Sequence, residues 1–233
     1  MHKIVLSDAA RARMTARTGK AHPFDAIDPR KAALVVIDMQ NYFCKPGHQG
    51  EVPASRDIVP NINRLAAELR RRGGLVIWVR NGTRDTRDSW SNYHDHLHTP
   101  DRCEARYAAM DIDGDGYAYW HANDIRPEDA QVTKTRYSAF IQGSSNIEVL
   151  LRDRDIDTIL VTGTATNVCC ESSARDAMML NFKVVMVSDG MATHNDEEHN
   201  AALSIFYGLF GDVQSTDETI ASLSRGDKAR AAA

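Results

Sequence analysis

Short apolar runs separated by amphipathic stretches recur along most of this chain. Continuous apolar runs of strand length occupy residues 33–37, 75–79, 158–162 and 184–187, and shorter candidates lie at 130–133 and 212–214. An apolar run without polar alternation is typical of a strand buried on both faces, as in a parallel sheet. The pattern therefore predicts six strands, most of them parallel.

Helix signals fill the gaps between these runs. Residues 58–72 place Ile62, Leu65 and Leu69 on one stripe and end at Gly73–Gly74. Further helices are predicted at 145–152, 168–180, 196–209 and after residue 215. Strands that alternate with helices indicate a sheet covered on both faces. We expect an α/β fold, a three-layer α/β/α sandwich with a six-stranded, mostly parallel, Rossmann-like sheet.

The chain divides by pattern into two parts. Residues 1–30 read as an irregular or part-helical arm, and residues 31–233 read as a single domain. Within the domain, residues 81–128 are long, polar and rich in turn residues. A span of that length inside a compact domain hides short elements or shapes a binding site.

Composition narrows the class of protein. Hydrophobic residues make up 42% of the 233, enough for a sizeable core, while a net charge of −4 gives no case for nucleic-acid binding. No apolar run reaches the length of a membrane span, and the N-terminus lacks the apolar core of a secretory signal. Four cysteines without a CxxC pair favour a reducing cytoplasm.

Candidate chemistry centres on residues 163–177, GTATNVCCESSARDA. Cys169 follows a predicted strand and stands at the start of a predicted helix. The free N–H groups and partial positive charge of a helix N-terminus favour a thiolate and can bind an oxyanion. The alternative interpretation is a small buried residue that packs a tight turn.

Two further reactive residues end predicted strands. Asp38 follows the first and Lys134 follows the third. In a parallel sheet the carboxyl ends of the strands share one edge, where ligands bind, and Asp38 would face Cys169 if the first and fourth strands are neighbours. Each residue has an alternative interpretation when it is taken alone. Asp38 could be a helix cap or turn residue, and Lys134 could be a solvated surface lysine.

Three ordered segments then identify a resemblance. ALVVIDMQNYF (33–43), KTRYSAF (134–140) and GTATNVCCESSARDAMMLNFKVVMVSDGMAT (163–193) resemble the isochorismatase-like cysteine hydrolases, and the likeness runs from about residue 32 to 217. The resemblance implies the isochorismatase-like hydrolase fold. It also implies Asp38 as base, Lys134 as electrostatic partner and Cys169 as nucleophile. Cys170, where the family usually has Val, is interpreted as packing.

The resemblance implies finer features of the site as well. A cis peptide is expected at Thr164–Ala165, with the amides of Ala165 and Cys169 forming the oxyanion hole. Cleavage of a small amide or ureido C–N bond would pass through a thioester on Cys169. No cofactor or metal is expected, and family members commonly form homodimers or homotetramers.

The substrate is argued from one strand end. Nicotinamidases carry an Asp-x-His element after the second strand, whereas this chain has Val79-Arg-Asn81-Gly-Thr-Arg-Asp85. WVRNGT (78–83) is instead similar to ureidoacrylate amidohydrolase. That likeness implies that Asn81 and Tyr137 contact the substrate, although Tyr137 is equally a core aromatic by pattern.

Several alternatives stay open at this stage. An isochorismatase-type vinyl-ether hydrolase, a nicotinamidase-like amidase and a non-catalytic binding protein use the same fold. His94, His96 and His98 alternate and would share a face on a strand, where they could bind zinc. Asp111–Gly116 matches half of an EF-hand loop but has Ala122 at the position of the required Glu, so it is interpreted as a turn.

Overall fold

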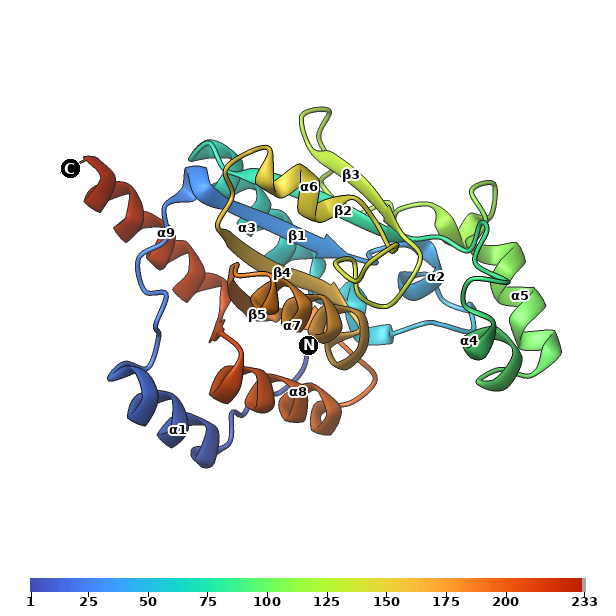
Figure 1. The fold of residues 1–233 in the computed structure, drawn as a ribbon, viewed down its shortest axis with the longest axis horizontal. Helices are drawn as coiled ribbons and strands as arrows, with labels where there is room; N and C mark the ends of the chain where they lie inside the picture. Colours follow the sequence, from blue (N-terminus) through green and yellow to red (C-terminus); the bar gives the residue numbers. More distant parts are fainter. Residues whose placement is uncertain (232–233) are drawn as a thin grey trace.

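A six-stranded parallel sheet organises the computed structural model, which describes residues 1–231 (Figure 1). The last two residues of the predicted domain lie outside the described part. The strands are β1 (Ala32–Ile37), β2 (Leu75–Asn81), β3 (Ala130–Lys134), β4 (Thr158–Thr164), β5 (Lys183–Ala192) and β6 (Asp212–Gln214). Their order is β3-β2-β1-β4-β5-β6, and all five pairings are parallel. The predicted fold class is confirmed, and β1 and β4 are neighbours, which is the condition for Asp38 to face Cys169.

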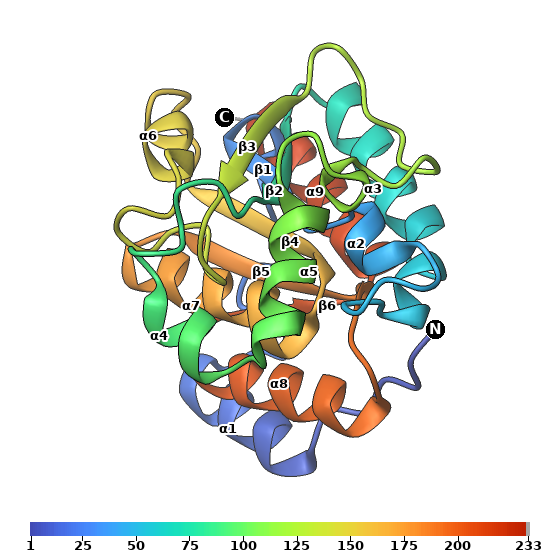
Figure 2. The same cartoon turned by 90° about the vertical axis from the view of Figure 1, so that its right-hand side faces the viewer.

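Helices cover both faces of the sheet (Figure 2). One face packs on α3 (Val59–Arg71) and α9 (Thr216–Ala231), and the other packs on α6 (Ile147–Arg152), α7 (Glu171–Met179) and α8 (Asp196–Leu209). Strand β1 serves both cores, since Leu34 and Val36 point toward α3 while Val35 and Ile37 point toward α7. This two-sided burial explains the unbroken apolar runs. No helix in residues 1–231 has the length and apolar character needed to cross a membrane.

The N-terminal arm is partly helical. Helix α1 (Asp8–Thr18) packs on α8 of the same chain, with Ala10 and Met14 buried. Its place on the outside of α8 is visible in Figures 1 and 2.

The long polar stretch contains short helices rather than open loop. Helices α4 (Ser91–His96) and α5 (Pro100–Met110) lie, with α2 (Asn41–Cys44), beyond the carboxyl end of β1 (Figure 1). Thr99 and Pro100 begin α5 in the way that a proline at the first helical position predicts. These helices therefore stand where a parallel sheet binds its ligands.

Two predicted helix starts differ from the structure. The helix expected from residue 168 begins earlier, with a π-helical turn at Thr166–Cys170 that leads into α7. The helix expected from residue 145 begins at Ile147, because Ser145 Oγ is used in bonds to Ala139 and Ile147 before the helix forms. Local turn geometry, which the apolar pattern does not report, sets both starts.

Gly163 makes the contact between β1 and β4 possible. It has φ +111° and pairs with Ile37, and a Cβ at this position would lie 2.0 Å from the Ile37 carbonyl oxygen. Gly163→Ala is therefore expected to destabilise the protein by about 3 kcal/mol or more, measured by denaturant unfolding.

Gly19→Ala provides the matched control. Gly19 also has positive φ, +72°, but nothing lies within 4 Å of a Cβ built there. It should cost only the left-handed backbone penalty of about 1 kcal/mol. Equal losses for the two variants would contradict the steric account of the Gly163 contact.

Candidate active site

Asp38 occupies the first position after β1. It is fully buried, its backbone is left-handed with φ 56°, and its N–H donates to Val79 O at 2.9 Å. A short polar side chain tolerates this backbone region better than most. The turn thus places a carboxylate at the carboxyl edge of the sheet.

Lys134, the last residue of β3, reaches the same point. Its side chain is fully buried, and Nζ lies 2.9 Å from Asp38 Oδ2 and 3.4 Å from Cys169 Sγ. It also donates to the carbonyl of Arg136 at 3.0 Å. The alternative of a solvated surface lysine is therefore wrong.

Charge is nearly balanced between these groups. Burial opposes the charged form of Lys134, but Asp38 and Cys169 outweigh it and raise its pKa. Neither Asp38 oxygen accepts a well-aligned hydrogen bond within the described residues, although the ammonium is close. The carboxylate consequently keeps lone pairs free to accept a proton.

Cys169 lies in the π-helical turn after β4 and is only 5% exposed. Burial, the largest cause, and the neighbouring Asp38 carboxylate together raise the pKa of its thiol to about 12 against the opposing effect of Lys134. The preference for a thiolate that was expected at a helix start does not decide the protonation of this thiol. Lost hydration and a negative neighbour outweigh the backbone dipole. Here Cys169 rests as a neutral thiol beside a base.

The backbone before Cys169 has the expected form. The Thr164–Ala165 peptide bond is cis. The amides of Ala165 and Cys169 donate to no described residue outside regular helix and strand bonding, whereas the next amide, of Cys170, bonds to Ala165 O at 3.1 Å. Cys170 itself is fully buried, with its sulfur 3.8 Å from Thr162 O.

A small cavity of about 190 Å³ opens onto Cys169. Asn81 and Tyr137, both predicted to contact substrate, line it together with Ala165. Its other walls come from residues that were not predicted to contact substrate, although His98 was considered as a zinc ligand. These are Tyr42, Phe43, Gln49, Gly50, Val52, Tyr93, His98, Arg102, Arg106, Val168 and His194.

Arg106 had a signal that the sequence analysis missed. On α5, Cys103, Arg106 and Met110 are the buried residues, spaced i, i+3 and i+7. An arginine at a core position of an amphipathic helix is uncommon, since arginine is seldom buried without a partner. A helix predicted to begin at Thr99–Pro100 would have put Cys103, Arg106 and Met110 on one face.

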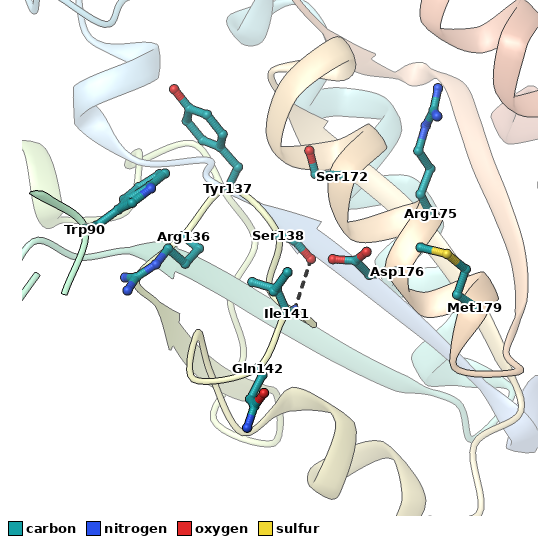
Figure 3. Close-up of a pocket in the computed structure, with 10 residues that line it drawn as sticks. All are labelled: Trp90, Arg136, Tyr137, Ser138, Ile141, Gln142, Ser172, Arg175, Asp176 and Met179. Atoms are coloured by element: carbon teal, nitrogen blue, oxygen red, sulfur yellow. Dashed lines mark hydrogen bonds between the residues drawn. The ribbon is translucent and has the colours of Figure 1, made fainter. Parts of the chain in front are cut away.

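A second hollow, of about 540 Å³, is lined by the residues drawn in Figure 3. Of its lining residues only Tyr137 also lines the catalytic cavity, and none is Asp38, Lys134 or Cys169. Trp90, Tyr93 and Tyr137 pack against one another, with ring centroids 4.2–5.5 Å apart. Tyr137 is thus part of an aromatic wall beside the cavity.

The histidine group at residues 94–98 and the turn at residues 111–116 were the two candidate ion sites. His94 and His96 lie on helix α4 rather than on a strand, and His94 bonds to Thr86. In the turn at residues 111–116, Asp115 is already paired with Lys45 and His48. Within residues 1–231 no group of three or more His, Cys, Asp or Glu side chains is arranged to hold a metal ion.

The site can be compared with known proteins. The isochorismatase domain family model matches residues 32–218. An uncharacterised isochorismatase family protein, YwoC of Bacillus subtilis, is 31% identical over 82% of this chain and 94% of its own. The ureidoacrylate amidohydrolase RutB of Klebsiella pneumoniae is 30% identical over 80% of this chain and 86% of its own.

A solved structure agrees. A cysteine hydrolase from Pseudomonas syringae pv. phaseolicola superposes with a TM-score of 0.74 and 28% identity, covering 86% of this chain and 95% of that one. Together with the family match over most of the chain, this similarity extends across the whole sheet and the edge that carries Asp38, Lys134 and Cys169. The chain therefore belongs to the isochorismatase family and is a hydrolase.

Proposed function

We propose that this hydrolase is a cysteine amidohydrolase that cleaves a C–N bond of a small amide or ureido compound. The observation that carries the proposal is the position of Lys134 Nζ, 2.9 Å from Asp38 and 3.4 Å from Cys169 Sγ at the end of a small cavity. Nucleophilic catalysis needs a thiol within reach of a base whose charge is held in place. The similarity to a ureidoacrylate amidohydrolase supports the substrate class.

In the first half-reaction Asp38 accepts the Cys169 proton as sulfur attacks the substrate carbonyl. The Ala165 and Cys169 amides donate to the oxyanion of the tetrahedral intermediate. Asp38 then passes the proton to the leaving nitrogen, the C–N bond breaks, and a thioester remains on Cys169. Lys134 Nζ, close to both groups, offsets the negative charge that passes between Cys169 Sγ and the Asp38 carboxylate.

In the second half-reaction water replaces the amine. Asp38 takes a proton from water, the hydroxide adds to the thioester carbonyl, and the C–S bond breaks. The proton returns to sulfur, so Asp38 and Cys169 end as they began and the products are an acid and an amine.

Release of ammonia or amine from ureido acids, carboxamides and nicotinamide tests the proposal. Alkylation of Cys169 with iodoacetamide at pH 9, confirmed by peptide mass, should abolish hydrolysis. The alkaline pH increases the small thiolate fraction of a thiol whose pKa is raised to about 12. Full C–N hydrolysis by completely alkylated protein would contradict the proposal.

The same experiment separates the alternatives. A vinyl-ether hydrolase needs no cysteine nucleophile, so cleavage that survives alkylation would favour an isochorismatase-type reaction. A nicotinamidase-like enzyme would prefer nicotinamide over ureido acids. A cytoplasmic location and assembly as a homodimer or homotetramer both remain predictions. Sedimentation velocity can test the assembly.

A further inference from the structure

Arg106 is a buried cation without a counter-ion. Its side chain lines the catalytic cavity and is 6% exposed, and Nη2 donates to Asn81 Oδ1 at 3.0 Å. Its Nε is buried and has no partner, and the guanidinium makes no ion pair within residues 1–231. A buried charge left in this state costs several kcal/mol. The fold therefore retains an arginine with a free donor and no balancing anion, which an anionic ligand would supply.

A structural arginine in the same protein has a different environment. The Arg70 guanidinium, also largely buried, contacts both oxygens of Asp129 at 2.6–2.8 Å and lies 3.2 Å from Asp124. Those carboxylates balance its charge and occupy its donors. Arg106 has a neutral amide and two tyrosine rings near it instead, and no carboxylate, so its surroundings are those of a binding residue.

A second unsatisfied donor lies in the same cavity. His98 Nε2 is buried without a partner, and His98 and Arg106 both line the space above Cys169. Burial, Arg106 and Arg102 lower the pKa of His98, which leaves a neutral imidazole able to present one N–H. No Asp or Glu is among the residues lining the cavity, and the Asp38 charge beyond it is offset by Lys134. The cavity is therefore positive overall.

We propose that Arg106 and His98 bind a carboxylate carried by the substrate, so that this enzyme acts on small amido or ureido acids. The proposal rests on the proposed amidohydrolase function and adds the anionic group to its substrate. Arginine donates two parallel hydrogen bonds to a carboxylate, and its free Nε provides one of them. The ring centroids of Tyr42 and Tyr93 lie 5.3 and 5.6 Å from the guanidinium carbon, so both rings face the arginine.

Cavity size sets the scale of that substrate. About 190 Å³ is below the 300–1,000 Å³ common for drug-sized ligands. A short acid with one amide or ureido group fits this volume, and a peptide does not. Arg106 then specifies the anion, while Cys169 attacks the carbonyl at the other end of the molecule.

Binding of succinate, measured by titration calorimetry, tests the anion site without requiring catalysis. Wild-type protein should bind succinate, and Arg106→Gln should weaken binding about 50-fold, as expected for loss of a charged hydrogen-bond partner. Arg106→Lys should recover part of the affinity. Arg84→Gln, the same charge change at an exposed arginine that pairs with Asp111 and does not line this cavity, should weaken binding less than about threefold.

Hydrolysis of a matched pair tests specificity. Succinamate and 3-nitropropionamide have similar shapes, but only the first is charged. Wild-type kcat/KM should favour succinamate, and Arg106→Gln should reduce that ratio about 50-fold. Because the readout is a ratio, a general loss of activity or of folded protein does not produce it.

Three results would overturn the anion site: equal succinate binding by wild type and Arg106→Gln, a wild-type ratio near one, or loss of selectivity in Arg84→Gln but not in Arg106→Gln. Efficient hydrolysis of both amides would reject the carboxylate requirement and leave the amidohydrolase function standing. Succinate binding through Arg106 without hydrolysis of any C–N substrate would support the anion site and reject the proposed reaction.

Discussion

Cys169→Ala is expected to lower kcat/KM for C–N hydrolysis by about 10⁴-fold or more, because it removes the atom that forms the covalent intermediate. Lys134 Nζ, now 3.4 Å from the sulfur, would lose that contact but keep its ion pair with Asp38. The protein should therefore stay folded, with a loss of about 1 kcal/mol for the small cavity left behind. Kinetics and thermal unfolding of the same preparation check both statements.

Cys170→Ala is the control. Its sulfur is equally buried and adjacent in sequence, but its contact is with Thr162 O at 3.8 Å rather than with the charged pair. It should lose a similar amount of stability and keep kcat/KM within about threefold, as a packing residue would. Comparable inactivation by both substitutions would mean that packing of the turn, and not the Cys169 thiol, is what activity requires.

Asp38→Asn is expected to lower kcat by about 10³-fold, the usual contribution of a positioned general base. Asparagine keeps the size of the side chain but does not accept the thiol proton. It also leaves Lys134 fully buried without its anionic partner. Some destabilisation is therefore expected, of up to about 3 kcal/mol, and activity is best compared well below the unfolding temperature.

The pH profile of Asp38→Asn distinguishes a lost base from a damaged fold. Without a base, attack depends on the thiolate that forms spontaneously, and burial, the largest cause of the raised Cys169 pKa, is unchanged by the substitution. Below that pKa the thiolate fraction grows about tenfold per pH unit. The residual rate should rise steeply from pH 7 to 10, whereas wild-type rate should not. Parallel profiles for the two proteins would contradict the role assigned to Asp38.

The sheet and its reactive edge were predictable because each depends on local pattern. Buried parallel strands leave continuous apolar runs, such as the one in β1, and Asp38 and Lys134 stand at the ends of such runs. Their meeting point then follows from the parallel topology. The match of three separate segments to one family added the assignment of roles.

The walls of the cavity were not predictable in the same way. Arg106 and His98 come from the stretch around α4 and α5, which was expected to hide short elements or to shape a binding site, without any residue being assigned to that site. Which side chain of a short helix faces the sheet depends on how that helix packs on distant segments. The charge of the cavity, on which the proposed anionic substrate depends, appears only when those segments are in place.

The protonation of Cys169 illustrates the same limit of local reasoning. A helix start predicts a lowered thiol pKa, yet burial and the Asp38 carboxylate raise it. The helix effect is local in sequence, whereas the burial comes from segments far from it. A neutral thiol that gives up its proton only to Asp38, with substrate present, is the chemical consequence.

Trapping of an acyl group on Cys169 tests the central claim most directly. Wild-type protein is mixed with succinamate or 3-ureidopropionate, quenched in acid within milliseconds to seconds, and analysed by intact and peptide mass spectrometry. We expect the mass of one acyl group, lost on treatment with hydroxylamine and located on the peptide that contains Cys169. Steady hydrolysis of these compounds with Cys169 unmodified at every time point, and unaffected by Cys169→Ala, would contradict covalent catalysis by this residue.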